Sequence, residues 1–166
     1  NEQVKVYRFL DFKLRELYSL IGGDLFFEGR ERSSMLGFRG QTYLTASENL
    51  ASFELEVEVL ADLLEDGIQI DPMFAFVRNP SELESSLDLA LNIFRRRGVM
   101  PRNIGMMSEI PTNVSRVEEF ASMMETAAQQ YGFHWYFSFG TNDLTQGLLH
   151  AGRDEPWLHH LNLGPA

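Results

Sequence analysis

Four apolar segments that are typical of β-strands alternate along the chain with four segments that have helical spacing. The strand-like segments are residues 4–12, 68–77, 103–110 and 134–140, and the helical ones are residues 48–66, 79–97, 114–130 and a segment that begins at 143. Alternation at these lengths predicts an α/β fold of parallel strands joined by crossover helices, either a doubly wound sheet or a β/α barrel. Both folds place ligand-binding side chains at the carboxyl ends of the strands.

The composition narrows the classes of partner that we expect. The 166 residues, 44% of them hydrophobic, suffice for one domain with its own core, which we take to cover residues 1–166. A net charge of −10 disfavours binding to nucleic acid or to an anionic membrane, because both need a basic surface. No apolar run approaches the roughly 18 residues of a membrane helix. We therefore expect neither nucleic acid nor membrane as a partner.

The start of the chain and its lack of cysteine suggest where the protein works. The first residues, NEQVKVYRF, have no initiator methionine and no signal-peptide profile, and the cysteine count is zero. We expect a cytoplasmic protein of which this chain is a piece, although chance would also explain the missing cysteines and processing would also remove a methionine. Zero cysteine also excludes a thiolate metal site and a cysteine nucleophile within these residues.

Polar side chains follow the expected strands at the points where those strands end. Arg8 lies near the end of the first strand, Glu109 ends the third, and Asn142 and Asp143 follow the fourth. Mg²⁺ typically takes one or two protein carboxylates together with water and substrate oxygens. Glu109 and Asp143 could therefore hold Mg²⁺ at a shared mouth. The alternatives are an N-cap at Asn142-Asp143 and two solvated acids.

A single arginine, Arg39, and a run of three arginines could each bind an anion. Arg39, in the glycine-flanked string MLGFRG, could fork onto a phosphate or carboxylate, or could be an ordinary surface charge. The run Arg95-Arg96-Arg97 could be a phosphate patch, but it is more typical of a basic helix C-terminus that complements the helix dipole. The four histidines show no metal-ligand spacing with acids, and we interpret them as structural.

Six strings together are more specific than any of these features alone. In chain order they are YRFLDFKLRELYSLIGG, SMLGFRG, MFAFVRNPSELE, MMSEIPTN, FSFGTNDLTQ and AGRD. Their order and spacing resemble the C-terminal phosphoenolpyruvate/pyruvate-binding barrel of the PEP-utilising enzymes, and within that family the phosphoenolpyruvate synthase (pyruvate, water dikinase) type. The resemblance covers about residues 4 to 157, and it implies a partial (β/α)8 barrel of the TIM type, truncated at both ends.

The resemblance also implies roles for individual residues. By their place in the family's strings, the implied substrate-binding residues are Arg8, Arg39, Asn142 and Arg153, and the implied Mg²⁺ ligands are Glu109 and Asp143; Asp11 matches the acid of the string around Arg8. The family's cysteine acid/base lies on a last strand that this chain does not contain, so no catalytic residue is assigned and the chain alone is expected to be inactive. Ser33-Ser34 replaces the family's Asn-Pro, and Arg15 replaces an asparagine usual in the synthases.

The function implied by the resemblance is Mg²⁺-dependent phosphoryl transfer. The domain would bind pyruvate or phosphoenolpyruvate and exchange a phosphoryl group with a phosphohistidine on another domain, in a parent enzyme that also has an ATP-binding domain. There are two alternative hypotheses. The chain could be a non-catalytic relative of this barrel that serves in binding or oligomerisation, or it could be an aldolase or lyase on a related Mg²⁺–pyruvate barrel. An incomplete barrel exposes strand edges, so we also expect a homo-oligomer.

Overall fold

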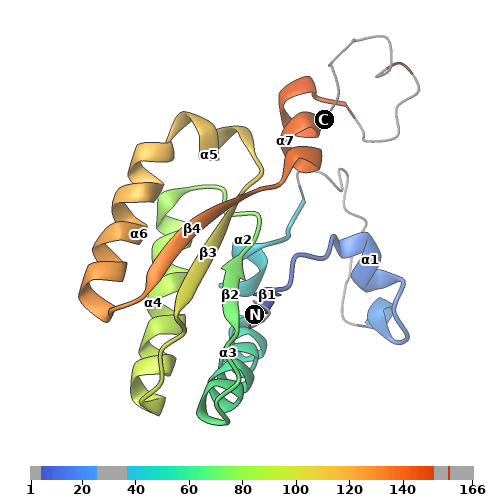
Figure 1. Cartoon of the computed structure of the whole chain (residues 1–166). Coiled ribbons are helices and arrows are strands. Elements are labelled where there is room, and N and C mark those ends of the chain that lie inside the picture. Colours follow the sequence, from blue (N-terminus) through green and yellow to red (C-terminus); the bar gives the residue numbers. More distant parts are fainter. Residues whose placement is uncertain (1–4, 26–36, 152–156, 158–166) are drawn as a thin grey trace.

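The structure is a computed structural model that describes residues 5–25, 37–151 and 157 (Figure 1). The elements, in chain order, are β1 (Val6–Arg8), α1 (Leu14–Tyr18), the 3₁₀ helix η1 (Gly23–Leu25), α2 (Gln41–Leu44), α3 (Leu50–Glu65), β2 (Asp71–Phe74), α4 (Pro80–Arg97), β3 (Asn103–Ser108), α5 (Pro111–Ser115), α6 (Val117–Tyr131), β4 (His134–Phe139) and α7 (Thr141–Leu149). The alternation of strands and helices that the sequence predicts is confirmed.

The four strands form one parallel sheet in the order β1-β2-β3-β4. Neighbours in the chain are thus neighbours in the sheet, with Val6 opposite Asp71 and Ile104 opposite Trp135. Because all four strands run in the same direction, their carboxyl ends meet at one edge of the sheet. The segments that follow β1, β3 and β4 leave the sheet there and run to α1, α5 and α7 (Figure 1).

Three long helices form a layer against the sheet. Helix α4 packs between α3 and α6, and the side chains of all three join those of the strands in a single hydrophobic core. Phenylalanines dominate this core, with the Phe9 ring centroid 5.1 Å from that of Phe53 and 5.0 Å from that of Phe74. Met124 of α6 is fully buried, as expected for a methionine that fills core space.

Local sequence signals account for the ends of α4. The Asn79 side chain accepts a hydrogen bond from the backbone N–H of Glu82 at 3.0 Å, Pro80 stands in the first turn, and Gly98 ends the helix with a φ of 71°. The phosphate-patch interpretation of the arginine run is wrong. Arg97 forms ion pairs with three acids of α3, and Arg96 pairs with one of them, so these side chains join the two helices.

Several expected boundaries were wrong. The strands expected at 4–12 and 68–77 are only three and four residues long. The Phe9 N–H makes a last sheet hydrogen bond to the Met73 carbonyl, and the chain then leaves the sheet. After β2, residues 75–77 are buried outside the sheet, and a buried loop has the same apolar pattern as a buried strand. The helix expected at 114–130 is two helices that meet at Arg116, whose φ of −119° is not helical. Among the described helices, none is long and apolar enough to span a membrane.

Candidate functional site

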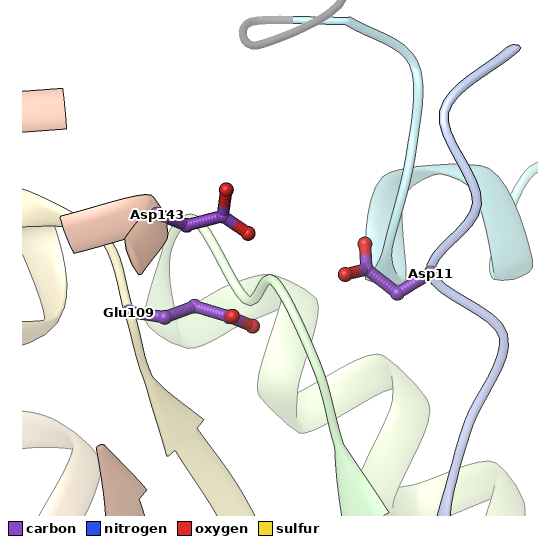
Figure 2. A group of neighbouring side chains, drawn as sticks. All are labelled: Asp11, Glu109 and Asp143. Carbon is purple, nitrogen blue, oxygen red and sulfur yellow. The ribbon is translucent and has the colours of Figure 1, made fainter. Parts of the chain in front are cut away.

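Three carboxylates converge at the carboxyl edge of the sheet. Asp11 lies three residues after β1, Glu109 directly follows β3, and Asp143 lies in the first turn of α7, just after β4. Each residue offers a carboxylate oxygen, and these oxygens all lie within 4.8 Å of one another. Figure 2 shows Asp11 pointing toward Glu109 and Asp143 from the opposite side of the space that they share. The parallel topology thus brings together acids that are up to 132 positions apart, and Asp11 and Asp143 follow the two edge strands of the described sheet.

Of the two acids expected to bind Mg²⁺, Glu109 is more buried than Asp143, with 2% of its surface exposed. Its Oε1 accepts a hydrogen bond of 2.7 Å from the backbone N–H of Phe76. Burial, with smaller contributions from the charges of Asp11 and Asp143, raises the pKa of Glu109 to about 7, against the opposing effects of the Phe76 hydrogen bond and of Arg39. Arg39 therefore compensates the charge of ionised Glu109 only in part.

Arg39 is the cation at the centre of the site. Only 4% of the residue is exposed, so the alternative of an ordinary surface charge is wrong. Its Nε and Nη2 donate to the two oxygens of Asp11 at 2.8 and 2.5 Å, and Nη2 also lies 3.2 Å from Asp143 Oδ2. Burial alone would lower the pKa of Arg39, but the hydrogen bond and charge of Asp11, and then the charges of Asp143 and Glu109, outweigh it and raise that pKa. Arg39 therefore stays charged.

One nitrogen of Arg39 has no hydrogen-bond acceptor among the residues that the structure describes. Within the described part of the chain, Nη1 is buried and has no partner, whereas Nε and Nη2 are both paired. A buried guanidinium donor left unpaired costs free energy, because it has lost its hydration without replacement. An anionic oxygen beside Nη1 would remove that cost.

Close backbone packing shapes the site. A Cβ at Gly140 would come within 2.4 Å of Glu109 Cβ, so the turn from β4 into α7 can lie against Glu109 only because this residue is glycine. Gly40, with a φ of 61°, similarly allows the backbone after Arg39 to lie against Phe76. Phe76 itself has a φ of 48°, which is strained for a phenylalanine.

Comparison with known proteins identifies the family. The family model described as "PEP-utilising enzyme, PEP-binding domain" matches residues 1–164. The chain belongs to this family. The PEP-binding domain is also 33% identical over 158 residues to the phosphoenolpyruvate synthase of Pseudomonas aeruginosa strain UCBPP-PA14, covering 94% of the chain and 19% of that protein.

Other phosphoenolpyruvate synthases are similarly related to this PEP-binding domain. The protein from Aeropyrum pernix is 34% identical over 155 residues, which cover 92% of the chain and 18% of the relative. The protein from Escherichia coli K12 is 31% identical over 151 residues, which cover 90% of the chain and 18% of the relative. The domain therefore spans less than a fifth of the length of these relatives. The resemblance drawn from the six strings is thus confirmed at the level of the family.

The structure brings together some of the expected site residues of the domain and leaves others apart. Glu109, Asp143 and Arg39 meet, as described. Arg8 and Asn142 are exposed, and among the described residues no hydrogen bond or ion pair joins either side chain to the three carboxylates. Arg153 lies outside the described residues. The N-cap alternative for Asn142-Asp143 is wrong, because Gly140 occupies the N-cap of α7 and both residues lie within its first turn.

The sequence did not predict the contributions of two residues to the site, Asp11 and Asn113. Asp11 matched an acid of the family strings but received no role, and it is the main partner of Arg39. Asn113 is 1% exposed; its Oδ1 accepts from the N–H groups of Glu109 and Ile110 at 3.1 Å, and its Nδ2 donates to the Val77 carbonyl at 2.8 Å. Asn113 thus fixes the backbone that carries Glu109. The string EIPTN was its only signal, and that string does not specify a contact.

Proposed function

We propose that this domain binds pyruvate or phosphoenolpyruvate together with Mg²⁺, with Glu109 and Asp143 as metal ligands and Arg39 as the cation that receives the anionic substrate. The observation that carries the proposal is the convergence of three carboxylates around a buried arginine whose Nη1 has no acceptor among the described residues. The first feature suits a divalent cation, and the second suits an anion beside it.

The donor set fits Mg²⁺. Carboxylate oxygens are the ligands that this hard cation prefers, and it usually takes one or two of them and fills its other positions with water and substrate oxygens. Both oxygens of Asp11 already accept hydrogen bonds from Arg39, which leaves Glu109 and Asp143 as the ligands that we assign. Burial is the main cause of the raised pKa of Glu109, and the charges of Asp11 and Asp143 add to it; a bound cation would offset both effects.

Each side chain would contribute in a distinct way. When bound, Mg²⁺ would supply Lewis acidity that makes formation of the pyruvate enolate easier. Arg39 would donate from Nη1 to a carboxylate or phosphoryl oxygen and offset its charge, while Asp11 holds the guanidinium plane in place. Arg8, Asn142 and Arg153 remain proposed substrate contacts on the strength of the family strings. We assign no catalytic residue within this chain.

In the whole protein, we propose the synthesis of phosphoenolpyruvate, the activity that the names of the relatives state. From the resemblance of the six strings we propose that this reaction uses ATP, pyruvate and water and releases AMP and phosphate. The phosphoryl group would reach this site from a phosphohistidine on another domain, so that domain and an ATP-binding domain are the proposed partners. Positioning and electrostatic stabilisation of the moving group would then be the work of this domain. We also propose that the enzyme acts in the cytoplasm.

We further propose that the sheet is part of a β/α barrel. A doubly wound sheet reverses its strand order at a switch point and carries helices on both faces, whereas barrel strands follow one another in sequence order with the helices outside. The order β1-β2-β3-β4 and the single layer of α3, α4 and α6 favour the barrel.

Calorimetric titration with oxalate, which mimics the pyruvate enolate, tests the proposed site. We expect oxalate to bind the chain only in the presence of Mg²⁺, and Asp143→Ala to weaken that binding by at least about tenfold, since loss of a charged ligand is worth more than about 1.4 kcal/mol. Asp62→Ala, on the outer surface of α3, is the matched control and should bind as the wild type does. Oxalate binding that ignores Mg²⁺ and survives Asp143→Ala would rule the site out and favour a binding module of another kind.

A further inference from the structure

Arg78 follows β2 and reaches into the segment that carries Arg39. Its Nη1 donates to the Arg39 carbonyl at 2.9 Å and to Thr42 Oγ1 at 2.5 Å, and its Nη2 donates to the Gly37 carbonyl. One guanidinium group therefore holds the backbone two residues before Arg39, the backbone of Arg39 itself, and the first turn of α2 just after it. These contacts make Arg78 a clamp on the segment 37–42.

The ring of Phe76 connects the two arginines. Its centroid lies 4.0 Å from Arg39 Cζ and 4.8 Å from Arg78 Cζ, and both distances are within the range of cation–π contact. The backbone N–H of the same residue donates to Glu109 Oε1. Phe76 thus touches the anion-binding cation and a proposed metal ligand, and its strained φ of 48° has to be maintained by such surrounding contacts.

A carboxylate closes this arrangement on the side of α4. The Thr42 hydroxyl donates to Glu82 Oε1 at 2.6 Å, and the backbone N–H of Arg78 donates to Glu82 Oε2 at 2.7 Å. Arg78, through its guanidinium and its backbone N–H, therefore forms a closed ring of hydrogen bonds with the Thr42 hydroxyl and the Glu82 carboxylate, and this ring ties α2 to the start of α4. Such a ring holds its members more rigidly than separate hydrogen bonds would.

We propose that Arg78 is a positioning residue for the anion site. It holds the 37–42 backbone and the Phe76 ring so that the Nη1 of Arg39 is presented to the anionic group of the ligand, and Arg78 acts on the ligand only through Arg39. This inference rests on the proposed function, because it takes the ligand of Arg39 to be pyruvate or phosphoenolpyruvate. The geometry of the clamp itself does not depend on the ligand.

The first test measures oxalate affinity of the full chain at saturating Mg²⁺. We expect Arg78→Met to weaken oxalate binding about tenfold, and Arg78→Lys to restore little of it, since one ammonium group cannot reproduce a planar fork that serves three acceptors. Thr42→Val, a smaller change that keeps the side-chain shape, should weaken binding about threefold. Arg96→Met, at the far end of α4, is the matched control and should leave the affinity unchanged.

Two further measurements separate positioning from general destabilisation. When Arg78→Met is added to the Arg39→Lys variant, oxalate affinity should fall by less than about a further twofold, because the effects of two residues that act through one another are not additive. Mn²⁺ affinity, followed by electron paramagnetic resonance in the absence of oxalate, should stay within about twofold of the wild type. Three outcomes would each overturn the clamp. The first is a full tenfold loss of oxalate affinity when Arg78→Met is added to Arg39→Lys, and the second is wild-type oxalate affinity in Arg78→Met alone. The third is a Mn²⁺ affinity that falls in parallel with the oxalate affinity.

A readout that needs no ligand distinguishes the failure of this inference from the failure of the proposed function. The Nε–H of Arg39 donates to Asp11 Oδ1, and its hydrogen exchange can be followed by nuclear magnetic resonance. We expect Arg78→Met, but not Arg96→Met, to speed that exchange at least about fivefold, since loosened groups exchange through local opening. If the wild-type chain binds no oxalate and the exchange is still faster, the substrate assignment fails while the clamp stands. If oxalate binds and the exchange is unchanged, the clamp fails.

Discussion

Glu109 gives the folded chain a pH dependence of known sign. Its pKa is about 7 in the fold because the carboxyl is buried, compared with an ordinary value of 4.5. Between these values the folded chain binds more protons than the unfolded chain, so the free energy of unfolding falls as the pH rises through this window. At a pH above the pKa of Glu109 in the fold, its ionisation lowers the free energy of unfolding by the full amount, roughly 3 kcal/mol. At a pH below the ordinary pKa this loss is absent.

The Glu109→Gln variant tests this effect in protein freed of metal with a chelator. The amide can still accept from the Phe76 N–H but does not ionise, so the variant should lose less stability than the wild type between about pH 5 and about pH 8. Urea unfolding measures the difference. Glu54→Gln, at an exposed position of α3, is the control and should follow the wild type. Equal slopes for Glu109→Gln and wild type would contradict the assignment of the raised pKa to Glu109.

The Asp11–Arg39 pair is a second prediction at the scale of single residues. Both side chains are at most 5% exposed, and removal of one member of a buried pair leaves an uncompensated charge. Asp11→Asn should lower the free energy of unfolding by about 2–4 kcal/mol, because Asp143 compensates Arg39 only in part. Asp62→Asn, which breaks an exposed pair with Arg97, should cost less than about 1 kcal/mol. Similar losses in urea unfolding for the two variants would show that burial does not govern the Asp11 pair.

At the scale of elements, the junction of β4 and α7 sets the spacing between the two proposed metal ligands. Gly140→Ala would place a Cβ within 2.4 Å of Glu109 Cβ and 2.7 Å of its Oε2, so the turn has to move. We expect a loss of about 1–3 kcal/mol in stability and a weaker affinity for Mn²⁺. Gly98→Ala, at the open C-cap of α4, should cost about 1 kcal/mol through its positive φ but leave Mn²⁺ affinity unchanged. Unchanged metal affinity in Gly140→Ala would count against a site that spans this junction.

The elements also show how far the sequence could be interpreted. Long periodic segments such as α4 and paired strands such as β3 carry their own signals, and the sequence predicted both close to their observed ends. Helix α2 is only four residues long and has no period to detect, so the sequence predicted no element there. The convergence of Glu109 with Asp143 followed from parallel topology. The contacts of Asp11 and Arg78 with the Arg39 segment did not, because they join positions 28 to 41 residues apart without a shared local pattern.

At the scale of the whole molecule, the helix layer and the mouth of the sheet have different kinds of ion pair. The pairs between Arg97 and α3 are partly exposed and stabilise the fold little, whereas the Arg39 pairs are buried and costly to desolvate. A buried network of charges adds little to stability, because the cost of desolvating the charges offsets the attraction between them. Its location at the carboxyl edge, where parallel folds bind ligands, argues that it is retained for binding.

The edges of the sheet lead to the last prediction, which concerns association. Within the described residues, β1 and β4 are edge strands, and unpaired edge groups favour pairing with another chain. Phe139 at the end of β4 is 72% exposed, and Leu148 of the adjoining α7 is 58% exposed. The chain alone should therefore give a light-scattering mass above its 19.0 kDa at micromolar to millimolar concentration.

Charge on that edge should oppose the association. Phe139→Lys should shift the mass toward that of the monomer, because an edge lysine has to lose its hydration when a second strand docks. Leu55→Lys changes a residue on α3 that is 64% exposed but lies away from β4, so this control should leave association through β4, and with it the mass, unchanged. A monomer at every concentration would refute self-association. Equal effects of the two lysines would instead indicate general hydrophobic adhesion, because only pairing along β4 depends on where on the surface the charge is placed.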